Sequence, residues 1–175
     1  MTAFKRFGFG LFVGLDLWIS LCLASLTLFM NRVGNFPIQT DAVMLVFFST
    51  LVVYNLDHVR DGAYVSSLHK TLRSITILIA SGMTIRLVAI APGAAQLCFL
   101  SYFTVGCIYS FPLGSSEAST IYNLVGRFKP GLVTGAIMIA AAGLPACWQG
   151  YVPSTGYLLI TLFIFHLVLM AVMFF

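Results

Sequence analysis

The sequence predicts an all-α integral membrane protein, a bundle of about six transmembrane helices that form a single domain over residues 1–175. Hydrophobic residues make up 60% of the chain and charged residues only 8%, whereas a soluble domain carries about 25% charged residues. The mean hydropathy of +1.02 is too high for a globule of this size, because much of its surface would face water. Long apolar runs alternate with short polar clusters, without the period-two alternation of barrel strands.

The polar clusters divide the chain into six expected helices, each long enough for a hydrocarbon core of roughly 30 Å. The expected spans are 8–30, 41–57, 74–91, 93–112, 131–147 and 153–175. Prolines lie at or near the ends of these spans, where a missing N–H does least harm; they are Pro37, Pro92, Pro112, Pro130 and Pro153. Pro145 falls in the last turn of the fifth span, where we expect a kink. The first span is too long for a signal peptide and lacks a cleavage site, so we expect it to be retained.

Basic residues are distributed unequally between the two sides that alternating spans define. One side holds Lys5, Arg6, Arg60, Lys70, Arg73, Arg127 and Lys129, and the other holds Arg32 and Arg86. The excess of basic residues predicts that the first side, with both termini, is cytoplasmic or equivalent. Membrane topology accounts for the net charge of +4, so no nucleic-acid partner is expected.

One unusually polar segment, residues 54–61, stands where the second span meets the predicted cytoplasmic side. In a helix, Asp57 and Asp61 are four residues apart and share a face. Two carboxylates form an oxygen site suited to Mg²⁺, which favours a few carboxylates together with substrate phosphates. Basic residues predicted on the same side can contact phosphate oxygens; they are Arg60, Lys70, Arg73, Arg127 and Lys129. The alternative interpretation is that these charges simply mark the membrane interface.

Three segments, in order and spacing, resemble the UbiA superfamily of intramembrane prenyltransferases. Asp57 and Asp61 match the last two acids of that superfamily's first aspartate motif, N-D-x-x-D-x-x-x-D, and His58 takes the position of a frequent arginine. Residues 109–113, YSFPL, are similar to the Y-S-x-P stretch that ends the fourth helix. Residues 127–131, RFKPG, are similar to the basic loop before the fifth helix. The resemblance spans the whole chain and about the first two-thirds of the superfamily's length.

The resemblance implies transfer of an isoprenoid from an allylic diphosphate to an aromatic or other hydrophobic acceptor. Mg²⁺ at Asp57 and Asp61 would hold the diphosphate, with Arg60, Lys70, Arg127 and Lys129 stabilising the leaving group. Tyr54, Asn55 and Tyr109 would line the substrate cavity. Aromatic side chains would shield the allylic cation; the candidates are Phe47, Phe48, Tyr54, Tyr102, Phe103 and Tyr109. The alternative for these aromatics is packing or lipid contact.

Departures from the superfamily's pattern leave a second function open. Val53 and Tyr54 stand where the motif has its first Asn and Asp, and Val133 stands where many relatives have a lysine. The second aspartate motif would begin where this chain ends, at Phe175. The sequence therefore predicts a truncated or degenerate prenyltransferase, or one that is active only with a partner that supplies the second motif. The alternative is a non-catalytic subunit of a larger membrane complex that binds lipid, quinone or pigment.

A few other polar side chains are predicted within spans. Asp16 lies two to three turns into the first expected span, where an acid either faces a cavity or stays hydrated near the interface. His166 in the sixth span is expected to hydrogen-bond a neighbouring helix or to ligate a pigment metal. The four cysteines, Cys22, Cys98, Cys107 and Cys147, form no C-x-x-C pair and are expected to be small buried hydrophobes.

Overall fold

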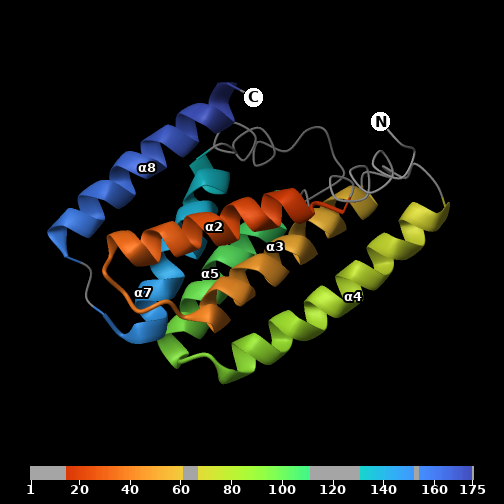
Figure 1. Cartoon of the computed structure of the whole chain (residues 1–175). Coiled ribbons are helices and arrows are strands. Elements are labelled where there is room, and N and C mark those ends of the chain that lie inside the picture. Colours follow the sequence, from red (N-terminus) through yellow and green to blue (C-terminus); the bar gives the residue numbers. More distant parts are fainter. Residues whose placement is uncertain (1–14, 61–66, 111–130, 152–153, 175) are drawn as a thin grey trace, which may run out of the picture.

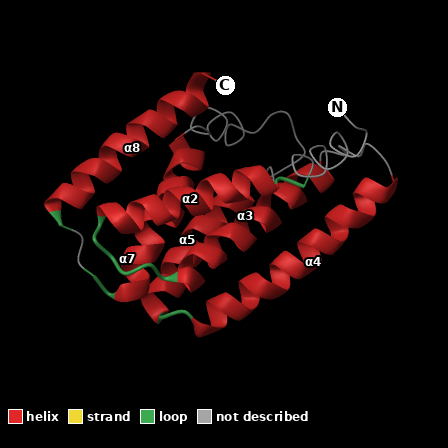
Figure 2. Cartoon of the chain, viewed as in Figure 1, coloured by secondary structure: helices red, strands yellow, loops and turns green. Residues whose placement is uncertain are grey.

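The computed structural model describes all residues except 1–14, 61–66, 111–130, 152–153 and 175. The described residues form six helical rods and no strand (Figure 2). Their bounds are α2 (Leu17–Val33), α3 (Thr40–Arg60), α4 (Ser67–Ile90), α5 (Gly93–Ser110), a rod over Gly131–Gln149, and α8 (Thr155–Phe174). The rod over Gly131–Gln149 contains the π-helical segment η1 (Ile139–Gly143) and α7 (Leu144–Gln149). The predicted all-α class is confirmed.

Three of the described rods are long and apolar enough to cross a membrane, over Thr40–Val59, Leu68–Ile90 and Gly131–Gln149. Three shorter apolar helices accompany them, over Leu17–Val33, Gly93–Cys107 and Thr155–Ala171. At 1.5 Å per residue, the 21-residue α3 is about 31 Å long, which matches a hydrocarbon core. A membrane protein is therefore indicated, whereas the number of spans and the side of each terminus stay predictions.

The bundle has a central group of helices and two outer ones (Figure 1). The central group comprises α2, α3, α5 and the rod over Gly131–Gln149, with α4 along one flank and α8 along the other. Helix α3 packs against α2, α4 and α5. The core includes Leu45 and Val46 of α3, Phe99 and Tyr102 of α5, and Leu144 of α7. The outer face of α8 is apolar and exposed, as expected of a surface in contact with lipid.

The buried face of α2 is polar. Ser20, Thr27 and Asn31 are fully buried, and each side chain donates a hydrogen bond to the carbonyl one turn earlier, at Asp16, Leu23 and Thr27 respectively. Such bonds satisfy a polar side chain within its own helix. Together with Ala24, these short side chains let α2 pack closely against α3 and η1.

The helix over Gly131–Gln149 departs from α geometry just before Pro145. The segment Ile139–Gly143 is π-helical, and the Leu144 N–H donates to the Ile139 carbonyl. Proline lacks an N–H and commonly perturbs the helix ahead of it, and π segments are a known cause of kinks. Ala140, Ala141 and Ala142 are buried here, so this small-residue segment packs against protein as its composition predicts.

Two element boundaries differ from those expected from the sequence. Helix α2 begins at Leu17, after a turn in which Asp16 has a φ of 57°, so Asp16 lies ahead of the helix and not two to three turns into it. Helix α4 begins at Ser67, ahead of the expected residue 74, so Arg73 belongs to a helix rather than to a loop. Asp16 and Arg73, the two residues concerned, both belong to the group of polar residues described next.

Candidate functional site

Five polar residues gather at the end of the bundle where α2 begins, α3 ends and α4 begins. Asp16 precedes α2, Asn55, Asp57 and His58 lie in the last turns of α3, and Arg73 lies in the second turn of α4. We call this group the charged cluster. The charged cluster brings together residues from three separate segments of the chain. It lies at the end of the bundle where the sequence has the unusually polar segment 54–61.

Asp16 is the most deeply placed acid of the charged cluster. Its residue is only 3% exposed, and its Oδ1 atom lies 3.3 Å from the Nε2 atom of the more exposed His58. Burial raises the pKa of the Asp16 carboxyl, because removal from water disfavours the charged form. The charges of His58 and Arg73 act in the opposite direction, and the charge of Asp57 adds to the rise. The site therefore holds a buried acid that two basic side chains compensate in part.

Asn55 fixes the turn before α2 against α3. Its Nδ2 atom donates to the carbonyl of Leu15 at 3.0 Å and to that of Leu51 at 2.9 Å. The Oδ1 atom of Asn55 is buried, without a hydrogen-bond partner among the described residues. Asn55 is thus a structural link behind the charged cluster, and its predicted role as a residue of the substrate cavity stays a prediction.

An apolar cavity of about 60 Å³ opens beside the charged cluster. Asp57 and Tyr54 lie at its polar end. The rest of its wall comes from α2, α3, α5 and the helix over Gly131–Gln149, through Leu23, Thr50, Val53, Tyr102, Val105, Gly106, Val133, Ala136 and Ile137. A carboxylate next to an apolar cavity is the arrangement that an amphiphile with an anionic head requires, provided that a cation bridges the two negative groups.

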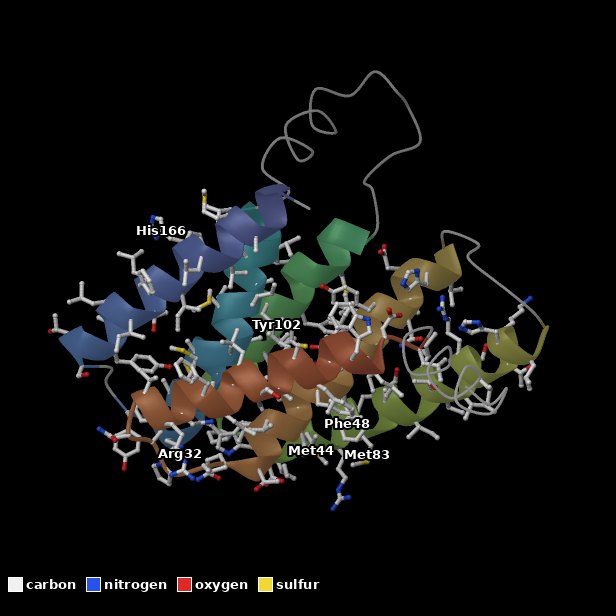
Figure 3. The ribbon with its side chains drawn as sticks, turned by 45° about the horizontal axis from the view of Figure 1, so that its top comes forward. Arg32, Met44, Phe48, Met83, Tyr102 and His166 are labelled. Carbon is white, nitrogen blue, oxygen red and sulfur yellow. The ribbon has the colours of Figure 1, made fainter. Side chains whose placement is uncertain are left out.

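Two residues shape the cavity wall. The Tyr102 hydroxyl is buried and hydrogen-bonds the Ser49 hydroxyl of α3, so that its ring stays in the middle of the bundle (Figure 3). On the same helix, a Cβ atom at Gly106 would lie 3.4 Å from the Cγ1 atom of Val53. A Cβ atom at Gly106 would therefore make an ordinary contact with Val53, whereas a longer side chain would extend into the cavity that both residues line.

We expect Gly106→Leu to fill the cavity and to weaken the binding of an apolar tail by about tenfold, the scale of one or a few methylene groups in a hydrophobic pocket. Gly82→Leu is the matched control, because Gly82 on α4 has open space around its Cβ position. Equilibrium binding of a fluorescent prenyl ligand to both purified variants measures the effect. Equal affinities for the two variants would show that the ligand lies elsewhere.

A larger groove of about 520 Å³ lies between α3, α4 and α5, away from the charged cluster. Its wall includes Thr84, Gln96, Phe99 and Phe103, and none of its described lining residues is charged. The groove offers volume for a lipid chain but no group for an anionic head. A lipid chain can therefore bind in this groove instead of in the smaller cavity, and a binding experiment must distinguish the two positions.

The predicted diphosphate and metal residues are only partly within the described structure. Asp57 is half-buried at the cavity, and Lys70 is exposed on α4. Asp61, Arg127 and Lys129 lie outside the described residues, as do the side chains of Arg60 and Tyr109. No group of three or more potential metal ligands occurs within the described part of the chain. The pairing of Asp57 with Asp61 at Mg²⁺ stays a prediction.

Most of the predicted aromatic lining packs elsewhere. Phe47 and Phe48 contact each other edge to face on α3, and Phe103 stacks on Phe99 of α5. These rings belong to the core clusters and to the larger groove, as the packing alternative for them predicted. Of the five aromatic candidates whose side chains the structure describes, Tyr54 and Tyr102 are found in the wall of the small cavity, and Phe47, Phe48 and Phe103 are not.

Two further predictions for intramembrane residues are corrected. His166 points away from the bundle on α8 (Figure 3), and its Nδ1 atom lies 2.8 Å from the Leu162 carbonyl of its own helix. Because His166 is exposed on an outer helix, it reaches no neighbouring helix among the described residues, whereas ligation of a pigment metal stays a prediction. Cys22 is exposed rather than buried, whereas Cys98, Cys107 and Cys147 are half-buried, and all four are free thiols.

Arg73 and Asp16 are the site residues that sequence reasoning placed least well. Arg73 is 2% exposed, although it was predicted in a solvated loop. The available signal was the acid itself, because an Asp in an apolar segment requires a basic partner. Spacing along the chain could not identify that partner, since the two residues are brought together only by the packing of α2, α3 and α4.

No family model matches the chain, and neither a curated protein nor a solved structure matches it. The resemblance to the UbiA superfamily therefore stays a prediction from the motifs of the sequence.

Proposed function

We propose that this protein binds an isoprenoid diphosphate, with the diphosphate at the charged end and the prenyl tail in the apolar cavity, and that its activity is prenyl transfer of the UbiA type. The observation that carries the proposal is the position of Asp57 at the polar end of that cavity. A carboxylate at a bundle end and an apolar wall behind it match the two halves of such a ligand.

A divalent cation is required by this chemistry, because the diphosphate and the aspartates repel each other. Asp57 and Asp61 would hold Mg²⁺, and their oxygen atoms are the donors that this ion prefers. When bound, the ion would neutralise charge on the leaving diphosphate. Asp57 has the position that this role requires, since it is half-buried at the cavity and belongs to the charged cluster.

Stabilisation of the allylic cation is assigned to aromatic side chains of the cavity. Tyr54 at the polar end and Tyr102 deeper in the wall present rings to the prenyl chain. The face of an aromatic ring stabilises a cation when water is excluded. The C–O bond would break to give diphosphate and the allylic cation, an acceptor entering from the membrane would attack the cation, and the acceptor would then lose a proton.

The cavity must expand to admit a prenyl tail. A cavity of about 150 Å³ accommodates benzene, and this one measures about 60 Å³. Movement of α5 relative to the helix over Gly131–Gln149 would enlarge it, because these two helices supply Tyr102, Val105 and Gly106 on one side and Val133, Ala136 and Ile137 on the other. The proposal therefore includes a closed state without ligand and a wider state with it.

The second candidate function is a non-catalytic isoprenoid carrier or membrane-complex subunit. Val133 favours it, because this apolar residue forms part of the cavity wall at the position where many UbiA members have a lysine. Lys70, one of the predicted phosphate contacts, is exposed. Under this alternative the prenyl tail binds but no bond is broken.

Labelled allylic diphosphates of several chain lengths, incubated with the protein in nanodiscs with and without Mg²⁺, distinguish these functions. Mg²⁺-dependent binding with release of diphosphate in the presence of an aromatic acceptor is the expected result. Binding of the ligand without diphosphate release identifies the carrier function. Absence of binding to folded protein at every chain length contradicts both.

The pH dependence of stability tests the state of Asp16. Its pKa is raised above an ordinary value near 3.8, so the folded protein retains a proton that the unfolded chain loses. The contribution of Asp16 to stability is complete below that ordinary value and declines as the pH rises through the raised pKa. We expect Asp16→Asn to remove this decline in the thermal unfolding temperature as the pH rises above the ordinary value, with Asp41→Asn, exposed at the other end of α3, as control.

A further inference from the structure

Two cysteines from different helices meet at the end of the bundle opposite the charged cluster. Cys98 lies in the second turn of α5, and Cys147 lies near the end of α7, two residues before Gln149. Helices α5 and α7 pack against each other, and the Cys98 sulfur lies against Gly143, which is one helical turn before Cys147. Both side chains are half-buried and pack against the same core cluster, beside Ile139 and Trp148.

The backbone around Cys98 is arranged to admit its sulfur. The Cys98 Sγ atom lies 3.7 Å from the carbonyl oxygen of Ile139, the first residue of the π-helical segment. A Cβ atom at Gly143, the last residue of that segment, would lie 3.3 Å from the same sulfur. The π segment and its glycine thus provide the space in which Cys98 contacts the helix that carries Cys147.

We propose that Cys98 and Cys147 form a reversible disulfide that links α5 to α7. In the bond-forming step, the thiolate of one cysteine attacks a small disulfide and releases one thiol. The second cysteine then displaces the remaining half of the reagent, so that two protein thiols become one disulfide and the oxidant becomes two thiols. Neighbouring thiols favour the second step because the reaction is intramolecular.

The link would join the two helices that supply opposing parts of the cavity wall. Tyr102, Val105 and Gly106 of α5 face Val133, Ala136 and Ile137 across the cavity. A disulfide between these helices restricts their separation, so it limits expansion of the cavity. This consequence rests on the proposed function, whereas formation of the disulfide does not.

A dipyridyl disulfide reagent tests the link directly. The chain with Cys22→Ser and Cys107→Ser retains only the Cys98–Cys147 pair, and the chain with Cys98→Ser and Cys147→Ser retains only the other two cysteines. We expect the first protein to release two pyridinethiols, to carry no reagent and to lose two hydrogen atoms in intact mass. The control protein should keep one reagent half on each cysteine that reacts.

Mixed disulfides on Cys98 or Cys147, or unreacted thiols on both after solubilisation in mild detergent, would contradict the proposal. Variants with Cys98→Ala or Cys147→Ala should show the same thermal unfolding temperature as the parent under reducing conditions, which separates a redox role from a packing role. Binding of a prenyl diphosphate, measured before and after oxidation, is a separate readout. If the disulfide forms but the prenyl diphosphate does not bind, the proposed disulfide is supported and only the proposed function is contradicted.

Discussion

Replacement of Arg73 by methionine is expected to lower the free energy of unfolding by about 3 kcal/mol, the upper end of the usual range for a single substitution. Arg73 is buried in α4, and its charge opposes the desolvation of the Asp16 carboxyl. Without that charge, the more exposed His58 is the basic neighbour of the buried Asp16 that is left among the described residues. Thermal or denaturant unfolding in detergent micelles measures the loss.

The double variant Arg73→Met with Asp16→Asn is the control for this prediction. Removal of both charges should recover most of the lost stability, because no uncompensated carboxylate is left inside the bundle. Arg86→Met serves as a second control on the same helix, since Arg86 is exposed. Equal destabilisation of the single and double variants would show that Arg73 acts through packing alone.

Replacement of Asp57 by asparagine is expected to weaken Mg²⁺-dependent binding of an allylic diphosphate by more than about tenfold. Loss of residues that only support a metal ligand already reduces metal affinity or activity by about 10–100-fold, and Asp57 is the proposed ligand itself. The side chain keeps its size, so the half-buried position and the cavity wall should be preserved. Isothermal titration with and without Mg²⁺ measures the change.

Asp41→Asn is the matched control for Asp57→Asn. Asp41 lies in the first turn of α3 and is exposed, so the same change of charge occurs on the same helix at the opposite end. We expect its affinity to equal that of the parent protein. A similar loss in both variants, or no loss in either, would remove Asp57 from the proposed site.

Sequence reasoning predicted the helical class well because composition and span length are properties of the chain itself. A segment such as residues 41–57 is too apolar for water and long enough for a membrane, and it matches α3 within a few residues. Boundaries were less predictable where polar residues continue a helix. Residues 67–73, SLHKTLR, contain basic and hydroxyl residues that are typical of an interface, yet they form the first turns of α4 because Arg73 packs inward.

The candidate site was predictable in part. Tyr54 and Asp57 were identified from a local pattern, since both belong to one segment of one helix. The role of Asp16 depends on the approach of α2 to α3 and α4, and the position of Gly106 in the cavity wall depends on the approach of α5 to α3. Contacts between segments that are far apart in the chain cannot be identified from the spacing of residues in a single sequence.

The most direct test of the central claim is photolabelling with a prenyl diphosphate that carries a benzophenone group at the end of its tail, followed by peptide mapping. We predict labels on the cavity segments that include Val53, Tyr102 and Ile137. Labelling should be reduced by Gly106→Leu and by removal of Mg²⁺. Labels confined to the outer face of α8, or to the larger groove around Thr84 and Phe99, would contradict it.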